Sequence, residues 1–356
     1  MIVKTIKKNI KNSNKTKVCV SLSSGVDSTI TLALLKKSLP DISIQSMSVK
    51  FAESDDETKR AAKIAKKANV EHKIIFLENF LQELPKAISI VKLPFWDLHW
   101  YYIVKNARKF SKILVSGDGG DELFGGYTFR YKKFQKLIKK QSTPIEKTKA
   151  YLLCHERDWV PDQDKIFGEK LHFSWDSTYK MLSPYFNNSL SPTSQVFLAD
   201  YNGKLLYNWV PNNTKLGENF GVKTITPLLS KESILFATHL REDLKYDKKN
   251  DVGKILLRKI LKKYSYSNMI NNTKQGFSVN TINLWKSHGK KLCDFYLNDG
   301  RIISDGLINK DWVLSHLNNP NIDVRYVNKF LGLLALEIWY RLFVTREMKP
   351  DEQLIV

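Results

Sequence analysis

Apolar and polar positions alternate in blocks along the first third of the chain, and these blocks predict strands and helices in turn. The apolar, β-branched run at 18–22 has the composition of a buried strand, and the apolar residues of 29–35 recur at helical spacing. Further strands are predicted at 42–49, 72–76 and 112–116, and further helices at 56–68 and 100–110. This alternation favours an α/β fold, a parallel sheet with helices on both faces.

The strand pattern fades past about residue 130, and the remaining chain is predicted to be mostly helical. Helices are predicted at 134–138, 196–209, 234–240, 252–264 and 327–343. Neither an internal repeat nor a low-complexity linker separates the two halves. We therefore expect the helical half to pack directly on the sheet.

A turn of small residues joins the first predicted strand to the first helix. It carries three serines, one glycine and Asp27 between 23 and 28. A strand end and a helix start bring backbone N–H groups and hydroxyls around one point, where the helix dipole favours an anion. Asp27 would repel a phosphate there unless a divalent cation lay between them, so it implies Mg²⁺. An ordinary serine-rich turn with a helix N-cap is the alternative.

A second turn, rich in glycine, follows the strand predicted at 112–116. It places Asp118, Asp121 and Glu122 within five positions, between apolar flanks. Like charges so close together are unfavourable unless a cation or hydrogen-bond donors hold them. A metal or substrate role is therefore favoured over an exposed acidic turn. Both turns follow the carboxyl ends of predicted parallel strands, which is where such sheets bind ligands.

Charge and composition narrow the classes of partner. The chain has 356 residues and a net charge of +21, but its lysines are scattered, which favours a solvated surface over a nucleic-acid-binding stripe. Three distant cysteines argue against a disulfide framework or a zinc site and favour a reducing cytoplasm. There is no signal-peptide pattern, and no uncharged apolar run approaches the roughly 20 residues of a membrane span.

Two motifs carry a resemblance to known families. Ser-Ser-Gly-Val-Asp-Ser at 23–28 resembles the Ser-Gly-Gly-x-Asp-Ser signature of pyrophosphate-loop ATPases, with Ser24 in place of the first glycine. Together with Gly-Asp-Gly-Gly-Asp-Glu-Leu-Phe-Gly-Gly-Tyr at 117–127, it resembles the synthetase domain of the asparagine synthetase family. Further matches follow in family order at 226–229, 253–258, 274–279 and 333–339.

The resemblance covers nearly the whole chain from Lys17 and implies an organisation. A synthetase domain over 17–345 would have the pyrophosphate-loop (adenine nucleotide alpha hydrolase-like) fold. Its nucleotide-binding α/β part would span 17–130 and its mainly helical part 131–345. A basic lead-in at 1–16 and a tail at 346–356 would flank it.

The resemblance also implies site residues. The triphosphate of ATP would lie against Ser23, Ser24, Gly25, Asp27 and Ser28, with Mg²⁺ between Asp27 and Asp121. The adenine would lie beside Leu22 and Val49, and the ribose beside Ser116 and Gly117. Asp118 would face the reacting carbonyl, and Lys274 would stabilise charge on the adenylate. Lys254 and Arg258, one helical turn apart, could serve the polyphosphate or a structural ion pair.

The implied activity is an ATP-dependent carbon–nitrogen ligase that forms AMP and pyrophosphate, as in amino-acid biosynthesis. It would adenylate a small-molecule carboxylate and transfer ammonia or another amine to it. Glutamine-using relatives begin with a glutaminase domain, whereas here the loop begins by Ser23. We therefore expect the nitrogen to come from free ammonia, a separate glutaminase subunit or the substrate itself.

Two departures from the family pattern leave alternatives open. Lys223 and Ile225 stand where asparagine-making relatives carry glutamate and arginine, so the acceptor carboxylate is not fixed. The chain could be a cyclising or sugar-acid amidating member. It could also be a polyanion- or RNA-binding protein that retains the fold without catalysis. An RNA-modifying ATPase is less favoured because no zinc-binding cysteine pattern is present.

Overall fold

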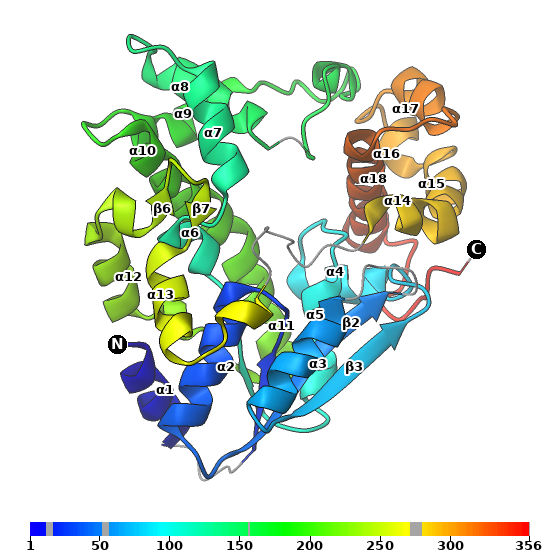
Figure 1. The fold of residues 1–356 in the computed structure, drawn as a ribbon. Coiled ribbons are helices and arrows are strands. Elements are labelled where there is room, and N and C mark those ends of the chain that lie inside the picture. The colour runs from blue at the N-terminus through cyan, green and yellow to red at the C-terminus, as the bar shows by residue number, and fades with distance from the viewer. Residues whose placement is uncertain (12–16, 52–56, 156, 271–279, 356) are drawn as a thin grey trace.

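The computed structural model describes residues 1–11, 17–51, 57–155, 157–270 and 280–355. At its centre, five parallel strands form one sheet in the order β3-β2-β1-β4-β5 (Figure 1). The strands are β1 (Lys17–Ser21), β2 (Ser43–Phe51), β3 (Glu71–Leu77), β4 (Ile113–Val115) and β5 (Lys223–Ile225). The prediction of a parallel α/β sheet is confirmed, and β5 is the strand of this sheet that the sequence pattern missed.

Alternate residues of the strands supply two hydrophobic cores, one on each face of the sheet. Val18 and Val20 of β1 belong to one core, whereas Cys19 between them belongs to the other. In β4, Leu114 belongs to the same core as Cys19, whereas Ile113 and Val115 belong to the core of Val18 and Val20. A strand buried on both faces therefore appears in the sequence as a continuous apolar run.

Helices cover both faces of this sheet (Figure 1). On the Val18 face pack α1 (Ile2–Lys11), α2 (Val26–Ser38), α3 (Glu57–Lys67), α12 (Lys231–His239) and α13 (Ile255–Lys263). On the Cys19 face pack α4 (Leu84–Val91), α5 (His99–Ala107), α11 (Val210–Phe220) and α18 (Val324–Phe343). The helices predicted in the first third are confirmed within a few residues at their ends.

The other helices form two groups on the side toward which the β2 and β3 arrowheads point (Figure 1). One group contains α6 (Gly120–Phe124), α7 (Thr128–Leu137), α8 (Pro144–Leu153), α9 (Asp176–Leu182), α10 (Pro192–Ala199) and the π-helix η3 (Asp200–Trp209). The other contains α14 (Thr281–Leu284), the π-helix η7 (Trp285–Gly289), α15 (Lys290–Leu297), α16 (Arg301–Ser304) and α17 (Lys310–Leu317). Short 3₁₀ turns lie at Gln163–Lys165, Ser183–Phe186, Pro227–Leu229, Glu242–Leu244 and Ser267–Met269.

One predicted helix starts later than its pattern indicates. Residues 252–264 are apolar at helical spacing, but Val252–Gly253 form β7, which pairs antiparallel with β6 (Tyr246–Asp247). Lys254 then adopts φ +58° and caps α13. Because Lys254 has a left-handed backbone, the regular helix begins at Ile255.

The topology of the sheet fixes where a ligand can bind. β1 pairs with β2 on one side and with β4 on the other. The chain adds β2 and β3 on one side of β1 and then β4 and β5 on the other side, so the order of the strands switches between β1 and β4. Open α/β sheets bind ligands at such a switch point, outside the carboxyl ends of the strands. The two turns singled out in the sequence follow β1 and β4. Within the described ranges, no helix is both long and apolar enough to cross a bilayer.

Candidate functional site

The turn between β1 and α2 is closed by its own hydroxyl groups. The Ser23 backbone N–H donates to Ser28 Oγ at 3.1 Å, and the two serine hydroxyls lie 2.9 Å apart. The Gly25 N–H donates to Ser23 Oγ at 3.1 Å, and Ser24 is buried. Asp27 lies in the first turn of α2. The turn is thus ordered at the start of a helix, with the Ser23 and Gly25 N–H groups and both hydroxyls engaged within it.

The second turn leads from β4 through Ser116 and Gly117 into the short helix α6. Gly119 and Gly125 flank that helix with φ of +87° and +75°, a region that favours glycine. Asp121 lies in its first turn. The two glycines therefore allow a five-residue helix, which carries Asp121 and Glu122, to form shortly after the end of β4.

Two further glycines let the two turns touch. A Cβ on Gly117 would lie 2.5 Å from the backbone carbonyl of Asp27, and a Cβ on Gly120 would lie 2.2 Å from the Asp27 carboxylate. Neither position has room for a methyl group. The second turn is thus packed against Asp27 at the distance that only glycine permits.

Gly117→Ala is expected to lower the free energy of unfolding by about 3 kcal/mol, because the clash is with backbone and cannot be relieved by a rotamer change. Gly332→Ala in α18 is the matched control, since no atom lies within 4 Å of its added Cβ. That variant should gain about 0.5–1 kcal/mol from helix propensity. Urea denaturation measures both, and equal effects of the two substitutions would contradict this packing.

The carboxylates of Asp27 and Asp121 meet at the ammonium group of Lys254. Lys254 Nζ is paired with Asp27 Oδ2 and lies 2.8 Å from Asp121 Oδ1. Burial works to lower the lysine pKa, but the two carboxylates outweigh it and raise that pKa above its usual value. Of the two roles predicted for Lys254, the structure shows an ion pair. Arg258, one turn further along α13, donates from Nε to the Gly253 carbonyl at 3.0 Å.

This donor set fits a magnesium ion. Across the described residues, no three or more His, Cys, Asp or Glu side chains are grouped as metal ligands. Mg²⁺ ordinarily uses one or two protein carboxylates and completes its octahedron with phosphate oxygens and water. Asp27 and Asp121 already share one cation, and the cradle of the first turn is next to Asp27. The residues therefore suit a magnesium ion that arrives with a phosphate ligand.

Asp118 has an enclosed carboxylate. Its Oδ2 atom is shielded from solvent and accepts no hydrogen bond within the described part of the chain, although the residue as a whole keeps some exposure. Burial raises its pKa to about 7; the Ser116 hydroxyl opposes this shift, while the charges of Glu122 and Asp27 add to it. A carboxyl group with such a pKa can exchange a proton near neutral pH.

The contribution of Asp118 to the stability of the ligand-free protein should fall as the pH rises from about 4 to 7, whereas the contributions of His72 and His99, whose pKa values burial lowers to about 4, should rise over most of that range. In that window folded Asp118 holds a proton that the unfolded chain has released, so deprotonation favours unfolding. Asp118→Asn should remove the falling contribution, so that stability rises more with pH than in the wild type, whereas Asp41→Asn, at an exposed loop residue, should leave the wild-type slope unchanged. Thermal melting across this range measures the slope. An unchanged slope in Asp118→Asn would contradict the assignment.

The remaining predicted site residues lie along the same edge, with one exception. Leu22 follows β1 and donates its N–H to the Met47 carbonyl of β2 at 2.8 Å, and Val49 lies two residues further along β2. Ser116 is buried directly after β4. The structure thus brings all the described candidates to neighbouring strand ends. Lys274 lies outside the described residues.

The two departures from the family pattern lie on β5. Lys223 begins the strand, and its ammonium group donates to the Asn9 carbonyl of α1 at 3.3 Å. Ile225 ends the strand as part of the hydrophobic core. Neither side chain takes part in the ion pairs that Lys254 makes with Asp27 and Asp121.

A buried polar network behind the second turn was not predicted. Tyr127 donates to Glu122 Oε1 at 2.6 Å, and the Arg130 guanidinium lies 4.3 Å from the centre of the Tyr127 ring. Arg130 also pairs with Asp200, whose Oδ1 accepts from the Tyr151 hydroxyl at 2.8 Å. Tyr127 ends the glycine-rich motif and could have been singled out. The Arg130–Asp200 pair joins positions 70 residues apart, and no local pattern signals it.

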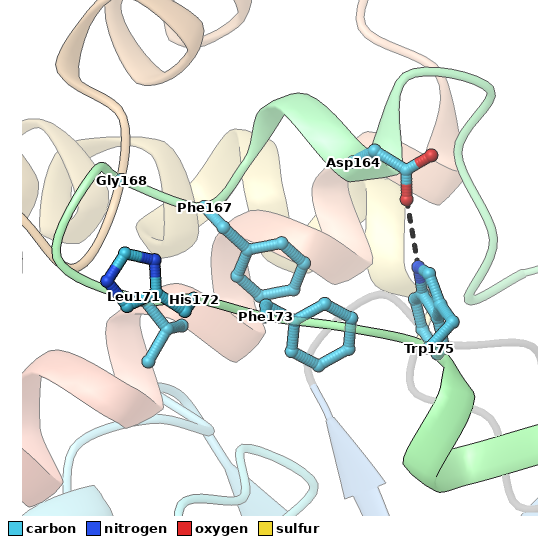
Figure 2. Close-up of a pocket in the computed structure, with 7 residues that line it drawn as sticks. All are labelled: Asp164, Phe167, Gly168, Leu171, His172, Phe173 and Trp175. Carbon is cyan, nitrogen blue, oxygen red and sulfur yellow. Dashed lines mark hydrogen bonds between the residues drawn. The ribbon is translucent and has the colours of Figure 1, made fainter. Parts of the chain in front are cut away.

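An aromatic hollow of about 370 Å³ is lined by residues between Asp164, in the 3₁₀ turn Gln163–Lys165, and Trp175, just before α9. Figure 2 shows Phe167 and Phe173 side by side, with Trp175 donating to Asp164. The segment is anchored to the α16–α17 connection, where Gly168 donates its N–H to the Leu307 carbonyl at 2.8 Å. None of the lining residues belongs to the two turns. The hollow offers packing surface but no carboxylate pair of the kind that Asp27 and Asp121 form.

Curated proteins of similar sequence are asparagine synthetases. The chain is 26% identical over 368 residues to asparagine synthetase [glutamine-hydrolyzing] 1 of Bacillus subtilis, covering 93% of this chain and 57% of that protein. It is 23% identical to a putative asparagine synthetase [glutamine-hydrolyzing] of Mycobacterium tuberculosis H37Rv, covering 93% of this chain and 55% of that protein. The chain therefore spans little more than half the length of these relatives.

A solved structure of NMN synthetase from Francisella tularensis is 14% identical and covers 58% of this chain and 92% of that one, with a TM-score of 0.30. The family assignment rests on sequence instead. The asparagine synthase family matches residues 8–341, which include both turns, the β6–β7 hairpin and α13. This chain belongs to the asparagine synthase family.

Proposed function

We propose that the chain is an ATP-dependent amide ligase that splits ATP into AMP and pyrophosphate while joining a carboxylate to an amine. The observation that carries this proposal is the meeting of Asp27 and Asp121, from two separate turns, at a single cationic group. Membership in the asparagine synthase family supports the same reaction class. Carboxylates arranged around one cation beside an anion cradle suit a triphosphate bound with a metal ion.

The nucleotide would lie along the carboxyl ends of β1, β2 and β4. In this proposal Ser23, Ser24, Gly25 and Ser28 bind the triphosphate, Leu22 and Val49 flank the adenine, and Ser116 and Gly117 flank the ribose. Asp27 and Asp121 would hold Mg²⁺. When bound, that ion would neutralise charge on the departing pyrophosphate. The preformed hydrogen bonds of the first turn support this arrangement, because little of it must be ordered on binding.

The reaction would proceed in two displacements. A carboxylate oxygen of the substrate attacks the α-phosphorus of ATP, the bond to the bridging oxygen breaks, and pyrophosphate leaves. The amine nitrogen then attacks the carbonyl carbon, AMP departs with the former carboxylate oxygen, and the nitrogen loses a proton. The protein contributes orientation and fixed charges. Asp118, whose pKa is raised to about 7, is the proposed acceptor of that proton, and Lys274 the proposed cation facing the adenylate.

The substrates are proposed by class. The acceptor is a small-molecule carboxylate, with aspartate as the first candidate because of the family. The nitrogen comes from ammonia, from a separate glutaminase subunit or from an amine of the substrate. We place the reaction in the cytoplasm, with no role for a membrane or a nucleic acid.

A pyrophosphate-release assay over candidate carboxylates tests the proposal. With the correct carboxylate, ATP, Mg²⁺ and ammonium, the protein should release pyrophosphate and AMP in equal amounts. A carboxylate labelled with ¹⁸O should transfer one labelled oxygen to AMP, because the acyl-adenylate breaks at the carbonyl carbon. Release of orthophosphate and ADP, or unlabelled AMP, would contradict the proposal. RNA binding that falls steeply with salt, without any turnover of ATP, would favour the polyanion-binding alternative.

A further inference from the structure

We propose that Lys254 holds the cation position between Asp27 and Asp121 in the nucleotide-free protein, and that a magnesium-bound triphosphate displaces it toward the phosphates. Binding would then exchange one cation for another instead of filling a gap. This inference rests on the proposed function and deepens it, since it assigns Lys254 a positioning role in the same site.

The geometry of the cluster is the first argument. One ammonium group contacts both carboxylates, at 2.8 Å in the case of Asp121, and the Lys254 side chain is only 11% exposed. Asp27 and Asp121 come from different turns that pack together through Gly120. Without a cation the two charges would repel each other at a site with little water. The lysine therefore keeps the carboxylates in an arrangement that a metal ion could also use.

The local structure shows how the lysine can move while its backbone stays fixed. Lys254 lies between β7 and α13, where it caps the helix. Its N–H donates to the Phe124 carbonyl at 3.0 Å. Its side chain then passes Gly126, where an added Cβ would lie 2.5 Å from Lys254 Cε. A lysine stem has four rotatable carbons, so Nζ can change position by rotamer changes alone. The backbone is tied to the same short helix that carries Asp121.

The exchange follows from charge and size. An ammonium group and a divalent cation that both contacted this pair of carboxylates would lie close together and repel each other strongly. Mg²⁺ alone must compete with a tethered ammonium and also give up part of its hydration shell. A triphosphate brings further negative charge, which binds the metal and offers the displaced lysine a new partner. Metal and nucleotide are therefore expected to bind together more strongly than either binds alone.

Manganese binding without nucleotide tests this role, and Lys254→Met is the informative variant because it keeps the apolar stem. The wild-type protein should bind Mn²⁺ alone weakly by titration followed with electron paramagnetic resonance. Lys254→Met should bind Mn²⁺ at least about tenfold more tightly, and Mn²⁺ should raise its melting temperature more than that of the wild type. Lys254→Arg, which keeps the charge, should stay weak. Lys290→Met, which removes a half-buried pair with Asp294 away from the two turns, is the matched control and should match the wild type.

Further variants and outcomes distinguish a failure of the cation exchange from a folding defect and from a failure of the proposed function. If Lys254→Met does not fold, Lys254→Gln carries the same expectation, because its neutral amide can still donate to one carboxylate. Equal or weaker Mn²⁺ binding by the folded neutral variant would overturn the exchange, while pyrophosphate release by the wild type would still stand. A wild type that releases no pyrophosphate with any carboxylate would instead defeat the proposed function and leave the Mn²⁺ comparison intact.

Discussion

Asp27→Asn is expected to reduce pyrophosphate release by at least about 10³-fold while leaving the protein folded. The substitution keeps the size of the side chain, so the contact with Gly120 is preserved. It removes the charge that both Lys254 and the proposed metal ion use. Because Lys254 still has Asp121 as a partner, we expect only a modest loss of stability.

The control for this result is Asp41→Asn, at an exposed residue between α2 and β2. It changes the net charge by the same amount and should leave pyrophosphate release unchanged. Circular dichroism establishes that both variants are folded. Activity of Asp27→Asn within tenfold of the wild type would mean that the cation and the nucleotide do not depend on this carboxylate.

Arg130→Met is expected to lower the free energy of unfolding by about 3–5 kcal/mol. The Arg130 and Asp200 side chains are 4% and 0% exposed, so the substitution leaves a carboxylate buried without its cation. The Tyr151 hydroxyl would remain as a donor to Asp200, and the Tyr127 ring would lose the guanidinium above it. Tyr127 also donates to Glu122, next to Asp121, so we expect activity to fall as well.

A paired substitution separates the loss of the ion pair from the loss of packing. Arg130→Met with Asp200→Leu should recover most of the stability, because two apolar groups in place of a buried pair leave no charge uncompensated. Arg241→Met is the exposed control, since its pair with Asp243 is largely in solvent and should contribute less than about 1 kcal/mol. Urea denaturation of all three variants gives the comparison. A loss below about 1 kcal/mol in Arg130→Met would contradict the role of this pair.

The sheet was predictable from sequence because its strands are buried on both faces. Val18, Val20 and Leu22 form the apolar run that a parallel strand requires, and the small residues that follow mark its end and the start of a helix. β5 was not predictable, because Lys223–Ile225 is too short to show a period and is a strand only through its pairing with β4. The start of α13 was misplaced for a similar reason, since Val252 belongs to a hairpin that pairs with Tyr246–Asp247.

The site was predictable in its components but not in its contacts. Asp27 stood out because a carboxylate next to an anion cradle needs a cation, whereas Asp121 was assigned to the metal ion through the family resemblance. That Lys254 supplies one depends on a residue with φ +58° placed by the hairpin, and helical spacing alone does not reveal this conformation. The Arg130–Asp200 pair depends on how α7 meets the π-helix η3. Such long-range contacts arise from packing and are not encoded in a local motif.

Anomalous diffraction from crystals grown with Mn²⁺ and a non-hydrolysable ATP analogue tests the central claim most directly. The account predicts one manganese peak in contact with both Asp27 and Asp121, with the triphosphate against the 23–28 turn and Lys254 Nζ turned toward the phosphates. A peak bound to only one of the two carboxylates, or a nucleotide bound away from this turn, would contradict it.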